Sequence, residues 1–296
     1  MITPATITRI EQAATMLGYV PNQAAVTLRT RSSRTVGLLA SGLGSPLLRG
    51  AETVLRSAGY MMIATAAPTA DAAETAVNGL LGRQTDGIIV ATSWPQGNGP
   101  ASLIGRTPAV SAVGPAPYSV APDLRAAADL AAEHLAELGH RTVACVSSLG
   151  APVSSGLLTA AARAVGLTVP QELVMNADGL TVSGGERVCG KLISSGTQFT
   201  AILTGSDVLA AGCCTALKEA GLACPAAVSV VGVGNLPLSA ILSVPLTTVS
   251  LPWYEVGVRA AQLLIARLHN PAEPEREILL PAALIRRSST GPLRVP

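Results

Sequence analysis

Basic side chains near the start of the sequence are the first candidates for chemistry. Residues 1–34 contain four arginines and one acid, a net charge of +3, whereas the whole chain of 296 residues has a formal net charge of +2. Residues 35–296 therefore sum to −1. The arginines are Arg9, Arg29, Arg31 and Arg34. Guanidinium groups gathered in this way suit phosphates and indicate a nucleic-acid contact, with a solvated linker as the plainer alternative.

Enzyme chemistry finds little support. His134, His140 and His269 are scattered, and the sequence has no GxxxxGK[ST], HExxH or GxSxG motif. Gly232-Val233-Gly234 lacks the third glycine and the acidic residue of a dinucleotide site. The five cysteines form neither CxxC pairs nor ligand sets with histidine, and we expect Cys213-Cys214 to be small buried residues within a helix. We therefore expect no enzyme activity, no cofactor and no metal site.

Composition limits the class of protein. Hydrophobic residues make up 49% and charged residues 13%, which excludes disorder for most of the chain. Aromatic residues make up 2%, so few rings are available to stack on sugars or bases. No apolar run is long enough for a membrane span, and the start lacks the pattern of an export signal. The odd number of cysteines, without CxxC pairs, indicates a reducing compartment. We therefore expect a cytoplasmic α/β protein.

The elements that position these residues fall into two series. The first has predicted strands Val36–Ala40, Tyr60–Ala64, Gly87–Ala91 and Ala109–Val113, with helices Pro46–Ala58, Ala70–Leu81 and Leu124–Leu138. The second has strands Val143–Val146, Ala201–Leu203 and Val228–Val231, with helices near Ser155–Val165, Gly184–Ser195 and Asp207–Ala220. Near-continuous apolar strands indicate parallel sheets covered on both faces. Two series predict two doubly wound subdomains with a cleft at the carboxyl ends of the strands.

A separate helical arm precedes the first series. Thr3 and Pro4 fit the cap and first residue of a helix, and Gly18 fits its carboxyl end. Asn22–Thr30, after Pro21, is long enough for two helical turns and too short to be stable alone in water.

Blocks along almost the whole chain resemble the lactose-repressor (LacI/GalR) family of bacterial transcription regulators, in that family's order. They are Ile2–Thr6, Leu17–Asn22, Ala25, Leu28–Thr30, Arg34–Leu39, Asp86–Ile89, Glu133–Leu135, Leu138–Arg141, Val228–Gly232, Pro245–Val249, Pro252 and Gly257. The resemblance implies a DNA-binding, helix-turn-helix repressor with a periplasmic-binding-protein-like core. It also implies a homodimer on operator DNA and control by a small-molecule effector.

The resemblance also implies boundaries. Residues 1–20 match a remnant of the headpiece, residues 21–34 the hinge, and residues 35–296 the core. Subdomain one is expected at about 35–139 plus 252–270, and subdomain two at about 141–248 plus 276–290. Crossings between them are then expected near Gly139–Arg141, Val249–Leu251 and Asn270–Glu275, with Ile278–Ile285 returning to subdomain two.

The hinge residues implied by the resemblance contact the minor groove. Leu28 matches a leucine that wedges between base pairs, at a cost of about a few kcal/mol per unstacked step that added contacts offset. Asn22 matches a backbone contact, and Ala25 a small residue that permits close approach. The full set of expected DNA-binding residues is Tyr19, Asn22, Ala25, Leu28, Arg29, Arg31 and Arg34.

The effector site departs from sugar- and purine-binding members. Ser154, Ser206 and Gly234 match positions that hold charged or amide side chains in those members, and each unpaired polar group on a ligand costs about 1–3 kcal/mol. We therefore expect an effector that is not a typical hexose, or a cleft that binds none. The alternative is that shifted loops let Asp123, Arg125, Asp207 and Asn235 supply the polar contacts. The expected site comprises Ser154, Ser206, Asp207, Gly234, Asn235 and Asp123.

The headpiece departs as well. Met1 immediately precedes the third helix of the family headpiece, so the helix that reads base edges is absent from this sequence. We expect the assigned start to lie downstream of the true one. The alternatives are a ligand-binding or dimerisation module that has lost sequence-specific DNA binding, and a solute-binding protein of transport.

Overall fold

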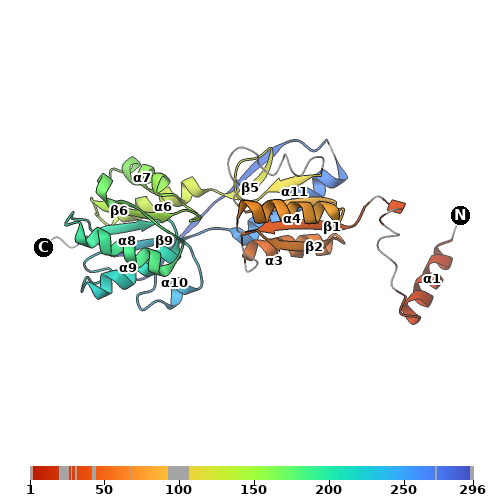
Figure 1. The fold of residues 1–296 in the computed structure, drawn as a ribbon, viewed down its shortest axis with the longest axis horizontal. Helices are drawn as coiled ribbons and strands as arrows, with labels where there is room; N and C mark the ends of the chain where they lie inside the picture. The colour runs from red at the N-terminus through yellow and green to blue at the C-terminus, as the bar shows by residue number, and fades with distance from the viewer. Residues whose placement is uncertain are drawn as a thin grey trace. The chain divides into compact units, whose positions relative to one another are not determined.

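The computed structural model describes residues 3–19, 27, 29–30, 32–41, 45–67, 69–92, 107–270 and 272–293. Two six-stranded sheets, each flanked by helices, make up the core of the chain (Figure 1). The described residues divide into two compact units. Unit 1 comprises residues 1–112, 116–118 and 257–276, and unit 2 comprises residues 113–115, 119–256 and 277–296. The fold class is therefore the expected one, α/β with two largely parallel sheets.

The first sheet has the strand order β11-β5-β4-β3-β1-β2. Its strands are β1 (Thr35–Ala40), β2 (Met61–Ala66), β3 (Gly87–Ala91), β4 (Ala109–Ser111), β5 (Tyr118–Pro122) and β11 (Arg276–Leu280). Helices α3 (Pro46–Ser57), α4 (Ala70–Gly82) and α11 (Trp253–His269) belong with these strands in the chain. Strand β1 pairs in parallel with β2 and β3, and its apolar residues are buried, as expected of a central parallel strand.

The second sheet has the order β12-β10-β9-β8-β6-β7. Its strands are β6 (Val143–Ser148), β7 (Val174–Ala177), β8 (Ala201–Thr204), β9 (Ser229–Gly234), β10 (Thr247–Ser250) and β12 (Ala283–Ile285). Its helices are α6 (Leu124–Glu137), α7 (Ser155–Ala164), α8 (Val182–Ser194), α9 (Asp207–Glu219) and α10 (Leu238–Ile241), with a 3₁₀ turn at Gln171–Leu173. Strand β12 is antiparallel to β10, whereas the pairs from β10 to β7 are parallel.

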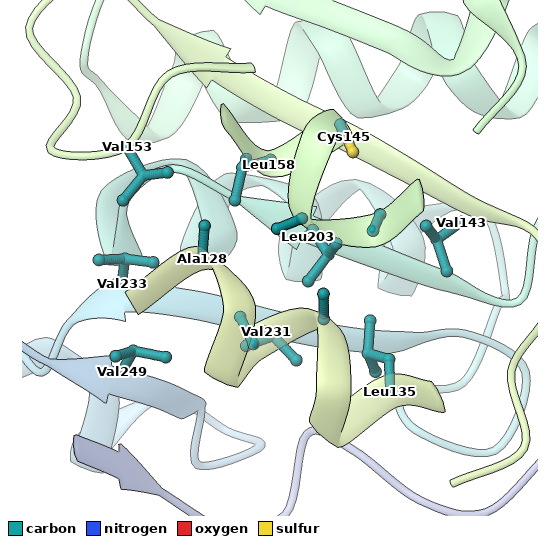
Figure 2. Close-up of a cluster of buried hydrophobic side chains, with 14 of the residues drawn as sticks. Ala128, Leu135, Val143, Cys145, Val153, Leu158, Leu203, Val231, Val233 and Val249 are labelled. Carbon is teal, nitrogen blue, oxygen red and sulfur yellow. The ribbon is translucent and has the colours of Figure 1, made fainter. Parts of the chain in front are cut away.

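The placement of α6 corrects one expectation. Residues 124–138 were expected in the first subdomain, but α6 packs in the core of unit 2. Figure 2 shows Ala128 and Leu135 of α6 among side chains that include Val143 and Val231 of the second sheet. Because one face of α6 is largely alanine, the helix lies close to these strands without displacing them. The chain therefore leaves unit 1 around β5, before α6 rather than after it.

The carboxyl-terminal strands confirm one expectation and add a detail to it. Residues 277–296 belong to unit 2, as expected of the returning segment Ile278–Ile285. Within this segment β11 pairs with β5 in the first sheet, whereas β12 joins the second sheet. Pro281 lies directly after β11 and lacks the N–H that a continuing strand would donate, which accounts for the break.

Serine, threonine and aspartate caps begin the helices as their residue types predict. Thr3 precedes α1 (Pro4–Met16), and its hydroxyl accepts from the backbone N–H of Thr6 at 3.4 Å. Gly18 has φ +62° just beyond the end of α1, which confirms the expected glycine at the carboxyl end. The expected segment Asn22–Thr30 lies mostly outside the described residues, although Thr27, Arg29 and Thr30 are helical. Among the described helices, none combines the length and apolar character required to cross a membrane.

Candidate functional site

A carboxylate holds the segment directly before β1 to unit 1. Asp86, in the turn before β3, accepts hydrogen bonds from the backbone N–H groups of Ser33 at 2.7 Å and Arg34 at 3.1 Å. It also accepts from the hydroxyl groups of Ser32 at 2.5 Å and Ser33 at 2.9 Å. We call Asp86, Ser32, Ser33 and Arg34 the Asp86 clasp. Charge-assisted bonds of this kind contribute about 1.5–3 kcal/mol each, so the clasp fixes the point where the chain enters β1.

Arg34 has an unusual backbone within the clasp. Its φ is +51°, in the left-handed region that costs an ordinary residue about 1–2 kcal/mol. Its carbonyl accepts from the N–H of Met61 at 2.8 Å, and its guanidinium lies 5.2 Å from the centre of the Tyr60 ring. Arg34 therefore contacts the core while its surface stays exposed. Arg34 was expected for its charge. Asp86 was expected only as part of the family block Asp86–Ile89, and its role in holding residues 32–34 was not predicted.

The other expected DNA-binding residues are described in part. Tyr19 and Arg29 are exposed. Asn22, Ala25, Leu28 and Arg31 lie outside the described residues. The structure joins Arg34 to the core, and DNA contact by all seven residues stays a prediction.

The second candidate site lies at the carboxyl ends of three neighbouring strands of unit 2. Ser154 precedes α7 after β6, Ser206 follows β8, and Asn235 follows β9. The loops after β6 and β8 touch, because the N–H of Val153 donates to the carbonyl of Gly205 at 3.3 Å. A Cβ at Gly205 would lie 2.0 Å from the carbonyl oxygen of Val153, so this approach requires glycine. We call this region the strand-end edge.

Ser154 and Ser206 have the same local role. The Ser154 hydroxyl accepts from the N–H of Leu157 at 3.3 Å, and the Ser206 hydroxyl accepts from the N–H of Val208 at 3.2 Å. Both residues are therefore helix caps. Ser154 is exposed, whereas Ser206 is buried. Sequence analysis predicted the position of both residues and missed the capping.

Asp207 is buried beneath the strand-end edge. Its carboxylate accepts from the N–H of Leu236 at 2.7 Å and from the hydroxyl groups of Ser239 at 2.6 Å and Thr248 at 2.5 Å. The same charge lies at the amino terminus of α9, where the helix dipole favours an anion. We call Asp207, Leu236, Ser239 and Thr248 the Asp207 cluster. These bonds join the loop after β9, α10 and β10, so Asp207 holds the edge in shape.

Gly234 and Asn235 form the turn above this cluster. Gly234 has φ +129°, which favours glycine, and Asn235 has φ +50°, which asparagine tolerates better than most residues. Asn235 Oδ1 accepts from Nη2 of Arg287 at 2.7 Å, and Arg287 Nη1 donates to the carbonyl of Leu246 at 2.7 Å. Arg287 is thus a part of the edge that sequence analysis did not name.

Asp123 has a different place. It is the cap of α6 and accepts from the N–H of Ala126 at 2.8 Å, and its own N–H donates to the carbonyl of Leu280. Arg125, the neighbouring alternative, pairs with Asp129 one turn along α6 at 3.0 Å. The hydrogen bonds of Asp123 tie it to α6 and β11, and β11 belongs to a different sheet from β6, β8 and β9.

Ser148 adds a polar group to the edge that sequence analysis missed. It ends β6, is 7% exposed, and its hydroxyl has no hydrogen-bond partner among the described residues. The next residue, Leu149, is 97% exposed. A buried hydroxyl without a partner costs about 1–3 kcal/mol, and a bound polar group would relieve that cost.

The paired sheets and the strand-end edge define a periplasmic-binding-protein-like core. Residues 132–290 match the periplasmic binding protein-like domain family. Over 99% of this chain and 89% of the relative, the sequence is 28% identical to the transcriptional repressor CytR of Escherichia coli K12. It is 30% identical to the transcriptional regulator reg1 of Streptomyces lividans over 94% of this chain and 86% of the relative.

Solved structures agree with the fold. The Lac repressor dimer bound to operator and an anti-inducer has a TM-score of 0.82 at 22% identity, covering 98% of this chain and 92% of that one. A LacI family regulator from Enterococcus faecium with bound ribose has a TM-score of 0.74 at 26% identity, covering 88% and 100%.

The chain belongs to the LacI/GalR family and is a transcriptional regulator. The named relatives are transcriptional repressors and regulators, not enzymes, which agrees with the expectation from the sequence.

Proposed function

We propose that the chain is a cytoplasmic repressor that binds a pseudo-palindromic operator as a homodimer. In this proposal residues 21–34 form the DNA hinge, Leu28 enters the minor groove, and Arg29, Arg31 and Arg34 pair with phosphates. The Asp86 clasp carries the proposal, because it fixes the end of an arginine-bearing segment to the sheet of unit 1. A segment anchored in this way transmits a change in the core to the DNA.

Operator binding by the full chain tests the hinge. The probe is the DNA upstream of the gene that encodes the chain, and the measurements are affinity and bend angle. Leu28→Ala should reduce both, because an apolar wedge is what kinks the duplex. Arg29→Ala should lower the slope of log K against log salt by about 0.9, the value for one phosphate contact.

Arg56→Ala is the matched control, because Arg56 is an exposed arginine of unit 1 paired with Glu52 at 3.3 Å. It should leave affinity and salt slope unchanged. Unchanged affinity and bend angle in Leu28→Ala would contradict the wedge. A chain that binds no DNA from this region would favour the alternative of a ligand-binding or dimerisation module.

We infer that an effector of this chain has fewer hydroxyl groups than a hexose. The strand-end edge offers the hydroxyl groups of Ser148 and Ser154, the NH₂ group of Asn235, whose Oδ1 is bonded to Arg287, and the apolar surface of Leu149. The carboxylate of Asp207 is occupied by bonds within the chain. A hexose at this edge would leave several hydroxyl groups unpaired, at about 1–3 kcal/mol for each.

Calorimetric titration with a sugar panel tests this inference. Hexoses should give no detectable binding, and micromolar affinity for a common hexose would contradict it. Ribose, which is bound in the Enterococcus faecium relative, belongs in the panel as the pentose. For a ligand found by a thermal-shift screen, Ser154→Ala and Asn235→Ala should weaken binding. Ser194→Ala, at the exposed end of α8, should leave it unchanged.

A further inference from the structure

Two half-buried thiols meet where α9 leads toward β9 in unit 2. Cys214 lies on α9, and Cys224 lies in the connection between α9 and β9. The two thiols line the same cavity and lie close enough to shift each other's pKa, and the Cys224 thiol donates to the carbonyl oxygen of Ser289 at 3.4 Å. Cys213 is the neighbour of Cys214 in the sequence. Cys214 shares the cavity with Cys224 instead, because Cys213 is fully buried in the core whereas Cys214 is only half-buried.

The thiol pair opens onto the surface. Both cysteines line a cavity of about 420 Å³ together with Lys218, Leu222, Ser243 and Val244. Lys218 lies one helical turn after Cys214 and is exposed, so it brings a positive charge to the cavity. A cation near a thiol favours the thiolate, which is the reactive form.

The two thiols differ in acidity. The hydrogen bond from Cys214 and a backbone hydrogen bond from Val230 lower the pKa of Cys224, while burial opposes them. The same hydrogen bond and burial raise the pKa of Cys214. Cys224 is therefore the nucleophile of the pair, and Cys214 is the thiol that resolves its oxidised form.

We propose that Cys224 and Cys214 form a thiol-oxidation site, in which a hydroperoxide that enters the cavity converts the pair into an intramolecular disulfide. The Cys224 thiolate attacks the O–O bond, which breaks to give the Cys224 sulfenic acid and, after protonation, an alcohol or water. The sulfur of Cys214 then attacks the sulfenic sulfur. An S–S bond forms, an S–O bond breaks, and the hydroxyl leaves as water with the proton of Cys214. Two thiols lose two electrons, and the hydroperoxide gains them.

The other cysteines of unit 2 supply an internal comparison. Cys189 and Cys213 also contact each other, between α8 and α9, but both are 0% exposed. Cys145 is 0% exposed as well, and burial raises its pKa to about 11. We therefore expect these three thiols to stay reduced while the Cys214–Cys224 pair reacts, since reactivity requires both access and thiolate character.

The experiment treats the reduced full chain with hydrogen peroxide, alkylates the remaining thiols and maps the peptides by mass spectrometry. Free thiols should fall by two of the five, and one cross-linked peptide should join Cys214 to Cys224. Cys214→Ser should stop at the Cys224 sulfenic acid, which dimedone traps. Cys224→Ser should lose the reaction of the thiol pair with peroxide, whereas Cys189→Ser should behave as wild type.

Three outcomes would overturn the proposal. One is that Cys214 and Cys224 stay reduced, and are therefore alkylated, at a peroxide dose that oxidises free cysteine. Another is that oxidation falls first on Cys189, Cys213 or Cys145. The third is a disulfide between two copies of the chain, seen as a dimer on a non-reducing gel. The wild-type peptide map needs no variant, so a variant that folds poorly leaves the test intact.

Discussion

The Asp86 carboxylate accepts both the backbone N–H and the hydroxyl of Ser33, a residue 53 positions earlier in the chain. Ser33 is buried, and it is followed directly by Arg34 and β1. The contact thus joins the segment before β1 to the turn before β3, and β3 is a parallel neighbour of β1 in the sheet. Residues 33 and 34 are thus held by the Asp86 side chain and not only by the covalent chain.

Replacing Asp86 by alanine should release the segment before β1. Two backbone N–H groups lose a charged acceptor, so exchange of the Ser33 and Arg34 amide protons should speed up by about tenfold or more, at about 1.4 kcal/mol per factor of ten. Operator affinity should fall with it. Hydrogen exchange with mass spectrometry checks the first result, and a gel shift checks the second.

Asp71→Asn is the control for this variant, since Asp71 is an exposed acid of the same unit, in the first turn of α4. Equal exchange rates in Asp86→Ala and wild type would show that Ser32–Arg34 is held by other contacts.

Replacing Asp207 by asparagine should destabilise unit 2. All three partners of the carboxylate donate hydrogen bonds, so an amide NH₂ in place of one oxygen faces a donor and leaves a buried group unpaired. We expect a loss of about 1–3 kcal/mol, visible as a lower Tm. Asp178→Asn, an exposed acid of the same unit, should change the Tm little. A Tm equal to wild type for Asp207→Asn would refute the structural role of the cluster.

Two glycines in neighbouring helices should respond in opposite directions to alanine. A Cβ at Gly212 on α9 would lie 2.0 Å from the carbonyl oxygen of Val182 on α8, so Gly212→Ala should cost about 1–3 kcal/mol or more. A Cβ at Gly190 on α8 meets nothing within 4 Å, so Gly190→Ala should stabilise by about 0.5–1 kcal/mol. Thermal unfolding compares them, and a Gly212→Ala chain as stable as Gly190→Ala would contradict the close packing of α8 and α9.

Stability should decrease at mildly acidic pH because of His140. This ring is 3% exposed, with Nδ1 2.9 Å from the Thr200 hydroxyl and Nε2 3.1 Å from the Ser229 hydroxyl. Burial lowers its pKa below 6.5, while a hydrogen bond to Gly291 acts in the opposite direction. The unfolded chain therefore binds this proton more readily than the folded one. The stabilisation is present above pH 6.5 and is lost as the pH falls through the lower folded value.

His134 adds to the same trend, because burial and the charge of Arg286 lower its pKa as well, partly offset by Glu137. His140→Gln should flatten the dependence of Tm on pH between neutral pH and about pH 5.5. His269→Gln, at an exposed position on α11, should leave it unchanged. A His140→Gln chain with the wild-type slope would exclude His140 as the source.

Periodicity predicts the elements that bury continuous apolar runs, and the structure confirms them. Strands β1, β3, β6, β8 and β9 and helices α3, α4, α6, α7, α8 and α9 agree with expectation to within a few residues. Strands β5, β7 and β10 were missed; β5 ends at Pro122, and β7 is a sheet edge that contains exposed Asn176. A local pattern says little about which sheet an element joins, which is why α6 was placed with the wrong partners.

The site is predicted less completely than the fold. The sequence places Ser154, Ser206 and Asn235 at strand ends, where the structure has them. The caps of α7 and α9 are local contacts that serine residues at these positions favour. The clasp of Asp86 on residues 52 to 54 positions away and the bond from Arg287 to Asn235 depend on contacts between distant segments. The pairing of Cys214 with Cys224 depends on the turn between α9 and β9 in the same way.

Strand β11 makes the amino-terminal sheet depend on the carboxyl-terminal end of the chain. Residues 276–280 form the edge strand beside β5 in the first sheet, so β5 has no partner on that side until these residues have been synthesised. During translation, β5 therefore has an unpaired edge that other chains can contact. Deleting residues 276–280 would expose an edge of a sheet whose other strands all lie before residue 123.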